Sequence, residues 1–419
     1  MKISFLVDNA YGTGQTIRAT ANISRALAAR HDVEVVSVHR TEVEPLLSFD
    51  ARVQLSSLID LRGPRGHAWA RRGAHPLSGR PSVMFHGPEA KKDRPRYTAL
   101  HDRRISGRLA RTDADVVVAT EPILNGYLAR YGGDRCLRIG QEHLSLAGYA
   151  AEVRRSQKAV INQLDAFVTI SEADADHYRS ALPSGLTRII YVPYGVTVPR
   201  AERASLDSKV IVAAGPFIPA KRYDRLIAAF AKVAPHHPAW TLRLYGRGPR
   251  QARLRSQIGE LGLHKRVLLM GSVAPIETEW AKGAIAAVSS DRESSGMSIL
   301  EAMHCGVPVV ATDCPHGPAE IITDHENGLL VPLDGGTDGY AEALDRLMSR
   351  PALRAELGES ACERARDVAP EVVALRYEDL FESLSADRRH RPIATSALPC
   401  SPGPLRSLRT RVRQRPGRV

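Results

Sequence analysis

The sequence predicts an α/β protein with two doubly wound parallel sheets in tandem. Short runs that are apolar at nearly every position alternate with helical stretches from the start of the chain, as at 3–7, 17–30 and 33–38. Strands that are apolar on both faces belong in a parallel sheet that helices cover. A polar stretch at 199–208 interrupts this series before it resumes, and 419 residues are enough for two packed domains.

Further strand-like runs support this division in order along the chain. The first series continues at 116–119, 167–170 and 189–192, and the second occupies 210–214, 240–245, 267–270, 284–288 and 307–310. We therefore assign residues 1–198 to a first domain and 199–370 to a second. An amphipathic helix at 371–385 is expected to pack back on the first domain, and 386–419, rich in Pro, Ser and Arg, to form a disordered basic tail.

The net charge of +12 is concentrated in two segments. Residues 62–111 hold thirteen Lys and Arg against three acidic residues, a net of +10, and 387–419 hold nine Arg against one Asp, a net of +8. The rest of the chain is therefore net −6. A nucleic-acid-binding protein would interleave aromatic residues among its cations, but 388–419 contain none, so this class is disfavoured.

The chain shows no membrane-spanning or disulfide pattern. No apolar run reaches the roughly 18 to 20 residues that cross a bilayer, and Asp8 and Asn9 interrupt the first one. We expect a soluble cytoplasmic protein. The five cysteines are widely spaced with no C-x-x-C pair, which indicates reduced structural thiols and no zinc or redox centre.

Residues 291–306 carry the most specific chemistry. A buried strand is expected to end near Ser290, Glu293 follows in a loop, Gly296 permits a tight turn, and a helix begins near Met297 with Glu301 one turn inside. The free amides of a helix N-terminus favour a phosphate. Two nearby carboxylates would repel that phosphate unless each accepts hydrogen bonds from hydroxyl groups. A nucleotide sugar, with hydroxyls on both sides of a diphosphate, fits this pattern.

The motifs of the second domain resemble those of retaining glycosyltransferases of family 4. The E-x7-E spacing of Glu293 and Glu301 follows the K-R-Y-D segment at 221–224 and the G-R-G-P segment at 246–249, and precedes N-G-L-L-V-P at 327–332, in the family's order. The resemblance implies a GT-B fold, in which the second domain mainly holds the nucleotide sugar and the first mainly holds the acceptor.

The resemblance also implies roles for individual residues. Glu301 would bind the ribose diol, Glu293 the donor sugar and Lys221 the diphosphate. The remaining donor contacts would come from the backbone of Gly296, Met297 and Ser298. Pro216 stands where the family usually has Arg. Arg222, next to Lys221, is therefore the candidate for a second cation. If this segment is extended, however, the side chain of Arg222 would point away from Lys221.

The first domain offers two candidate segments. Gly12 and Gly14 follow the first strand and resemble the glycine loop that approaches the donor phosphate or the acceptor, although any turn from strand to helix favours Gly. His143 follows a strand around 136–139 and resembles the family's histidine beside the donor sugar. Its expected role is to position a sugar hydroxyl. For an inverting mechanism, His143 or Glu142 would be the candidate base.

Two D-x-D segments resemble the metal-binding motif of metal-dependent transferases. We expect Asp113 and Asp115, before a strand, and Asp174 and Asp176, in a helix, to be solvated carboxylates instead. We therefore expect neither a metal nor another cofactor. His316 is expected in a loop.

Together these features predict an enzyme that transfers a sugar from a nucleoside diphosphate sugar, with a bias to UDP, to an acceptor hydroxyl with retention of anomeric configuration. Envelope polysaccharide, glycolipid and secondary-metabolite acceptors stay open. The alternatives are a nucleotide-sugar epimerase of related fold and a basic nucleic-acid-binding protein. The segment 62–111 is expected either to contact the acceptor and the inner face of an anionic membrane or to be a solvated Arg-rich insertion.

Overall fold

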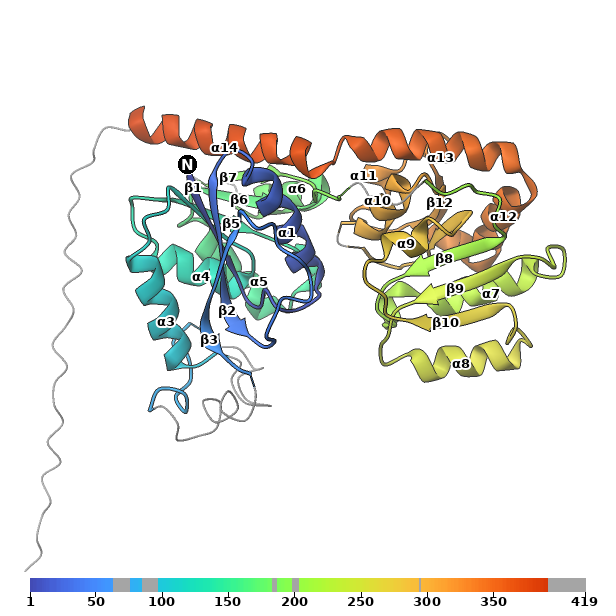
Figure 1. Cartoon of the computed structure of the whole chain (residues 1–419), viewed down its shortest axis with the longest axis horizontal. Coiled ribbons are helices and arrows are strands. Elements are labelled where there is room, and N and C mark those ends of the chain that lie inside the picture. Colours follow the sequence, from blue (N-terminus) through green and yellow to red (C-terminus); the bar gives the residue numbers. More distant parts are fainter. Residues whose placement is uncertain (63–75, 85–96, 183–186, 198–202, 294, 391–419) are drawn as a thin grey trace, which may run out of the picture.

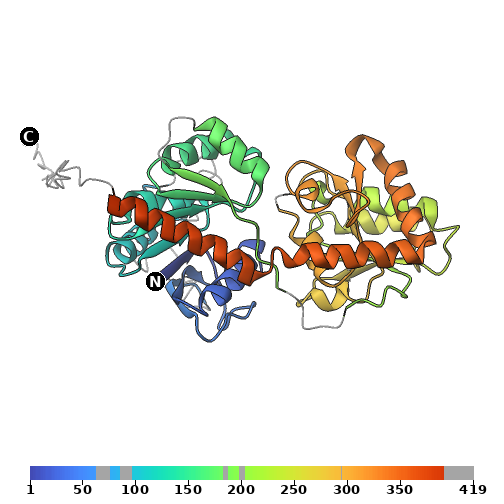
Figure 2. The same cartoon turned by 90° about the horizontal axis from the view of Figure 1, so that it is seen from above.

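The computed structural model describes the chain except for residues 63–75, 85–96, 183–186, 198–202, 294 and 391–419. It consists of two lobes, each built on one parallel sheet with helices on both faces (Figure 1, Figure 2). The predicted fold class is confirmed. In the described part of the chain, no helix is long and apolar enough to cross a bilayer.

The first lobe is built on a sheet with strand order β3-β2-β1-β4-β5-β6-β7, all parallel. Its strands are β1 (Lys2–Val7), β2 (Asp32–Arg40), β3 (Gln54–Asp60), β4 (Val116–Ala119), β5 (Leu137–Gln141), β6 (Ala166–Thr169) and β7 (Arg188–Tyr191). Its helices are α1 (Gln15–Leu27), α3 (Ala99–Ala110), α4 (Pro122–Tyr131), α5 (Ala151–Ile161) and α6 (Glu172–Ala181). The central strands are buried on both faces, as their apolar sequences predict.

The second lobe repeats this architecture with strand order β10-β9-β8-β11-β12-β13. Its strands are β8 (Val210–Ala214), β9 (Thr241–Tyr245), β10 (Val267–Gly271), β11 (Ile285–Val288), β12 (Val309–Asp313) and β13 (Leu329–Pro332). Its helices are the short 3-10 helices η3 (Pro219–Lys221) and η4 (Leu333–Gly335), and α7 (Tyr223–Val233), α8 (Gln251–Glu260), α9 (Glu277–Trp280), α10 (Met297–His304), α11 (Pro318–Ile321), α12 (Gly336–Ser349) and α13 (Pro351–Arg366).

The chain crosses between the lobes twice, and the two crossings touch. The Val196 amide donates to the Val368 carbonyl at 3.1 Å, and a Cβ on Gly195 would lie 2.9 Å from the Cα of Pro370. The returning chain then forms α14 (Pro370–His390), which lies along the first lobe (Figure 2). Its buried side chains, such as Val373, Tyr377 and Phe381, belong to the core that α1 also lines.

The tail prediction was wrong at its start, because α14 continues five residues beyond position 385. Ion pairs hold this last turn on the first lobe. Asp387 pairs with Arg188 at 2.8 Å, and Arg388 pairs with Asp165 at 2.6 Å. Residues 391–419 lie outside the described residues.

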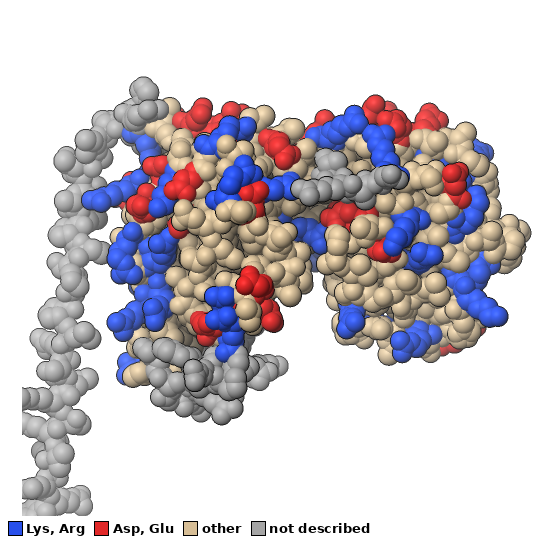
Figure 3. All heavy atoms as spheres, in the orientation of Figure 1, with Lys and Arg blue, Asp and Glu red and all other residues tan. Residues whose placement is uncertain are grey.

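The prediction of an insertion at 62–111 was wrong over about its last quarter. Residues 99–110 form α3, a regular helix that packs on the first sheet through Leu100, Ile105 and Leu109. Arg103 and Arg104 are exposed on α3, which lies on the side of the first lobe that faces away from the second lobe (Figure 1), and Figure 3 shows Lys and Arg side chains on that side. Most of the other cations of this segment lie outside the described residues.

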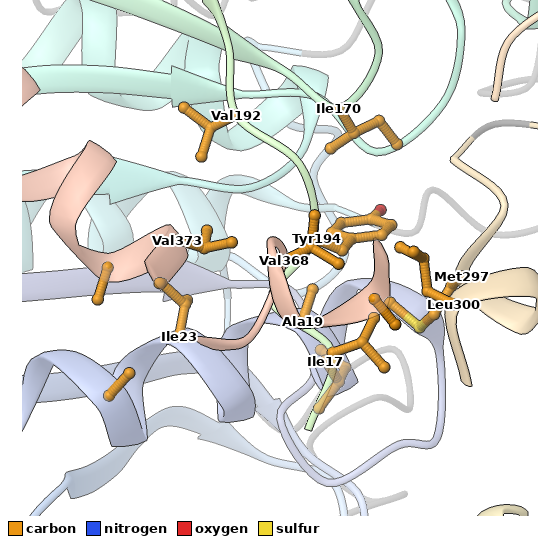
Figure 4. Close-up of a cluster of buried hydrophobic side chains, with 14 of the residues drawn as sticks. Ile17, Ala19, Ile23, Ile170, Val192, Tyr194, Met297, Leu300, Val368 and Val373 are labelled. Carbon is orange, nitrogen blue, oxygen red and sulfur yellow. The ribbon is translucent and has the colours of Figure 1, made fainter. Parts of the chain in front are cut away.

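The two lobes also share an apolar contact. Ile17 of α1 and Tyr194, which precedes the first crossing, lie beside Met297 and Leu300 of α10 in one buried cluster (Figure 4). This contact brings the N-terminal turns of α1 and α10 face to face. Glu301, the second glutamate of the E-x7-E motif, is therefore positioned against the first lobe.

Candidate functional site

The site is organised around the N-terminus of α10. Gly296 caps this helix with φ of 60°, a left-handed conformation in which a side chain is strained. A Cβ on Gly296 would also lie 2.7 Å from Cδ1 of Ile321. Both constraints require glycine here, and the resulting turn presents the amides of Met297 and Ser298 at the start of the helix.

Glu301 lies one turn inside α10 and is 6% exposed. Its Oε1 accepts from Nη1 of Arg18 at 2.9 Å, and its Oε2 accepts from the indole Nε1 of Trp280 at 3.4 Å. Burial raises the pKa of Glu301 to about 7; the Arg18 cation opposes this shift, and nearby Glu277 adds to it. The carboxylate is thus held in place by both domains.

Glu293 and Lys221 form a second, separate pair. The ammonium of Lys221 lies 2.7 and 2.9 Å from the two carboxylate oxygens of Glu293, which also accepts from the Ser290 hydroxyl at 2.6 Å. The side chains are 15% and 4% exposed. Gly215, with φ of 153°, gives Lys221 its space, since a Cβ there would lie 3.3 Å from Cε of Lys221 and 2.9 Å from the hydroxyl of Tyr223.

Arg222 does not join this pair. The residue adopts φ of 46° between η3 and α7, and its guanidinium donates to Asp224 at 3.1 Å and to Asp291 at 2.8 Å. The structure therefore brings Lys221 and Glu293 together and gives Arg222 different partners. Arg222 does not replace the cation that the family usually has at the position of Pro216.

His143 follows β5 on the first domain and is buried. Its Nδ1 lies 2.6 Å from the hydroxyl of Tyr194, while its buried Nε2 has no hydrogen-bond partner in the described part of the chain. Burial lowers the pKa of His143 to about 3, so the ring is neutral near pH 7. A neutral ring with one free nitrogen can position a hydroxyl group.

Glu142 is part of a structural network. One of its oxygens accepts from the amides of His143 and Leu144 and from the hydroxyl of Tyr149 at 2.6 Å, and the other accepts from Gln157 and Tyr178. Because every lone-pair direction is occupied inside the domain, Glu142 orients the backbone that carries His143.

Gly12 and Gly14 lie in the loop before α1, and Gly14 is its N-cap. Neither adopts a positive φ. Within the described ranges of the chain, a Cβ on Gly14 would meet no atom within 4 Å, and one on Gly12 would meet only Asn9 at 3.6 Å or more. The fold therefore does not require glycine at position 14, and a side chain there would occupy the space in front of α1.

Sequence reasoning missed Arg18. This residue lies one turn inside α1, four positions after Gly14, and reaches across to Glu301 at 2.9 Å and Glu277 at 3.2 Å. The available signal was this four-residue spacing, which places Arg18 on the face of the helix that follows the glycine loop. Trp280, the other partner of Glu301, gave no local signal.

The prediction that the carboxylates of both D-x-D segments are solvated was wrong for one residue. Asp113 and Asp115 accept from the side chain and the amide of Lys2, respectively, and Asp176 pairs with Arg179 on the surface. Asp174, predicted to be solvated, is fully buried. The loop before α5 covers it, and the amide of Leu146 donates to its Oδ1 at 3.1 Å.

Comparison with known proteins supports the identity of the second domain. Residues 197–364 match the family described as Glycosyl transferases group 1. The whole chain is 35% identical over 396 residues to an exopolysaccharide phosphotransferase of Streptomyces coelicolor, covering 93% of this chain but 41% of that protein. It is 25% identical over 234 residues to a poly(ribitol-phosphate) alpha-N-acetylglucosaminyltransferase of Staphylococcus aureus, covering 55% of this chain and 47% of that one. The chain thus spans less than half the length of either relative.

Solved structures resemble the chain over both lobes. A Staphylococcus aureus TarM mutant in complex with fondaparinux, alpha-GlcNAc-glycerol and UDP aligns with a TM-score of 0.71 at 15% identity, covering 91% of this chain and 99% of that one. Anabaena HepE in complex with UDP and glucose aligns with a TM-score of 0.67 at 19% identity, covering 91% and 100%. At these identities the likeness shows the fold. Residues 197–364 therefore match the glycosyl transferases group 1 family, and the two-lobed chain that contains them has the GT-B fold.

Proposed function

We propose that this chain is a retaining glycosyltransferase that uses a nucleoside diphosphate sugar, with UDP as the favoured nucleotide. The observation that carries the proposal is the pair of buried carboxylates on either side of the α10 N-terminus. Glu301 faces Arg18 and Trp280, and Glu293 faces Lys221. A ligand with hydroxyl groups at both ends of a diphosphate satisfies both carboxylates and the helix amides at once.

Donor binding would exchange partners at both carboxylates. The ribose hydroxyls would donate to Glu301, which now accepts from Arg18. The diphosphate would lie at the amides of Met297 and Ser298 and attract Lys221 from Glu293. Glu293 would then accept from a hydroxyl of the donor sugar. Each ion pair of the free site is replaced, so neither carboxylate is left buried and unpaired.

The proposed reaction takes place on one face of the sugar. The acceptor oxygen forms a bond to the anomeric carbon while the bond from that carbon to the diphosphate oxygen breaks. The acceptor proton passes to the departing phosphate oxygen, so no basic side chain is needed. Lys221 and the α10 amides stabilise the negative charge that develops on the diphosphate. Neutral His143 positions a sugar hydroxyl through its free Nε2.

We further propose that the acceptor is a cell-envelope polysaccharide. The relatives named above include an exopolysaccharide phosphotransferase and a poly(ribitol-phosphate) glycosyltransferase. Arg103 and Arg104 on α3 give the first lobe a cationic outer surface suited to a phosphate-bearing polymer or an anionic membrane.

The test is calorimetric titration with UDP, UDP-glucose, UDP-N-acetylglucosamine and the corresponding GDP compounds. We expect saturable binding that Glu301→Ala weakens by at least about tenfold, or about 1.4 kcal/mol. The exposed Glu326→Ala in the same domain serves as the control and should bind as the wild type does.

Product analysis separates the remaining alternatives. NMR of the product formed with an acceptor should give the donor's anomeric configuration, and an inverted product would contradict the retaining mechanism. An isomerised nucleotide sugar formed without acceptor would instead identify an epimerase. If no nucleotide binds, the transferase proposal is withdrawn.

A further inference from the structure

A cluster of three metal-ligating side chains lies between the two domains, apart from the residues used above. Asp174 and His177 come from the first turns of α6 in the first domain, and His316 comes from the loop between β12 and α11 in the second. One ligand atom of each residue lies within 4.8 Å of the other two. The rings of His177 and His316 are 5.5 Å apart, edge to face.

Among the residues that the structure describes, two polar atoms in this cluster are buried without a partner. Oδ2 of Asp174 has no hydrogen bond, although the residue is fully buried, and its other oxygen accepts only the Leu146 amide. Nδ1 of His316 is likewise buried and unpartnered. A buried carboxylate oxygen and a buried imidazole nitrogen that both lack partners are costly unless a cation or a proton donor joins them.

The contacts within the cluster do not satisfy these atoms. The nearest approach between Asp174 and His177 is 3.9 Å, from Oδ1 to Nδ1, which is too long for a hydrogen bond. Glu320 adds a further negative charge nearby, but its oxygens accept from the amides of Glu172 and Ala173 at 2.9 and 3.2 Å. The environment is therefore anionic and contains two imidazole nitrogens.

We propose that Asp174, His177 and His316 bind a divalent transition-metal ion of the Zn²⁺ class, which joins the two domains beside α10. Two imidazoles and one carboxylate are a common ligand set for such ions, with a fourth position left for water. Ligand atoms about 2.0 to 2.2 Å from Zn²⁺ lie roughly 3.5 Å from one another. The cluster needs to contract by about an ångström, which a small approach of the domains supplies because His316 belongs to the opposite domain.

The proposed metal site lies next to the loop that begins α10. Gly317, next to His316, packs directly on the loop that begins α10, since a Cβ on Gly317 would lie 3.1 Å from the amide nitrogen of Gly296. Bound metal would therefore hold this loop against the first domain. The inference does not depend on the proposed transferase activity, and it leaves the expectation of metal-free transfer chemistry unchanged.

The experiment is calorimetric titration of ZnCl₂ into untagged, chelator-treated full-length protein near pH 7. We expect one ion per chain. His177→Gln, on the exposed side of the cluster, and His316→Gln should each weaken binding by more than about tenfold. His264→Gln, which changes an exposed histidine of the second domain outside the cluster, is the matched control and should bind as the wild type does.

A second readout tests the ligands directly. Bound Co²⁺ should give visible ligand-field absorption that is lost in both cluster variants and kept in the control. The two histidines lie in different domains, so wild-type affinity in His316→Gln would reduce the site to a local feature of α6 and overturn the proposal. No ion bound, or loss of the ion in His264→Gln alone, would also overturn it. Thermal unfolding of each variant without metal verifies that it is folded.

Discussion

The two domains contribute different chemistry to the candidate site. The second domain supplies charge: Glu293, Glu301 and Lys221 are all largely buried and all are ion-paired before any ligand arrives. The first domain supplies mainly a neutral group, the free Nε2 of His143, and leaves open space in front of Gly14 among the described residues. Arg18 is the exception, because it carries charge from the first domain to the second. This contrast separates binding of the charged donor from orientation of the reacting groups, and each half can be tested alone.

The largest effect is expected from removing the cation of the second domain. Lys221→Ala leaves Glu293 buried with the Ser290 hydroxyl as its remaining partner, so we expect a loss of about 3 kcal/mol of unfolding free energy. If Lys221 stabilises the diphosphate as proposed, kcat should also fall by about 100- to 1,000-fold. Chemical denaturation and steady-state kinetics measure the two effects. Lys232→Ala, which breaks an exposed pair with Asp338, should change neither appreciably.

A matched pair of glycine variants compares the helix starts of the two domains. Gly296→Ala places a Cβ at φ of 60° and 2.7 Å from Ile321, so it should lower the unfolding free energy by at least about 1 kcal/mol. Gly14→Ala meets open space, so its unfolding free energy should change by less than about 0.5 kcal/mol. If a ligand approaches α1, Gly14→Ala should still lower kcat/KM several-fold. Unchanged kinetics in a stable Gly14→Ala protein would remove this loop from the site.

Donor affinity should depend on pH through Glu301. Because the pKa of its carboxyl is raised to about 7, Glu301 of the ligand-free protein is largely protonated at pH 6 and ionised at pH 8. If the ribose binds the carboxylate, affinity for UDP-glucose should rise by up to about tenfold over this range. UDP-glucose is the suitable ligand because its diphosphate diester does not titrate there. Glu301→Gln should give a flat profile, and an equally steep one would assign the dependence to another group.

The contribution of Glu301 to folding stability should change with pH in the opposite direction to its contribution to donor affinity. Its pKa is higher in the folded protein than the ordinary value of 4.5, so the folded state binds more protons between pH 4.5 and 7. This contribution to stability is fully present below pH 4.5 and is lost as the pH rises through 7. The pH dependence of donor affinity is therefore not a consequence of greater stability at high pH.

The smallest effect should come from the residue that connects the two halves. Arg18 lowers the pKa of Glu301, so Arg18→Met should move the midpoint of the donor-affinity profile to higher pH. Repeating the UDP-glucose titrations with this variant measures the shift. Arg25→Met, on the same helix and paired with Glu371 at 3.8 Å, is the control. A midpoint that moves down would contradict the role assigned to Arg18.

Local pattern was sufficient where burial follows from sequence neighbours. The strands that are apolar on both faces predicted the two parallel sheets, and the segment from Glu293 to Glu301 predicted a loop and helix start where α10 begins. Local pattern was insufficient for β3, a strand at the sheet edge, because the polar residues Gln54, Ser56 and Ser57 interrupt its apolar pattern. It also failed for α3, because the Arg run obscured the apolar positions at Leu100, Ile105 and Leu109.

Contacts between distant segments could not be predicted. Arg18 meets Glu301 across 283 residues of sequence, and Asp174 is buried because a loop 28 residues earlier in the chain covers it. Neither partner leaves a periodic signal near the residue that it affects. The sequence therefore predicted which charged residues belong to the candidate site, while their pairing depended on how the domains meet.

The return of the chain through α14 has a consequence for biosynthesis. The apolar side of α1 is made within the first 30 residues, yet Val373, Tyr377 and Phe381, which share its core, are made after nearly the whole second domain. During translation the first domain therefore exposes part of its core until the second domain has emerged from the ribosome. Such a surface is a target for chaperones, and a stop codon before position 370 would make that exposure permanent.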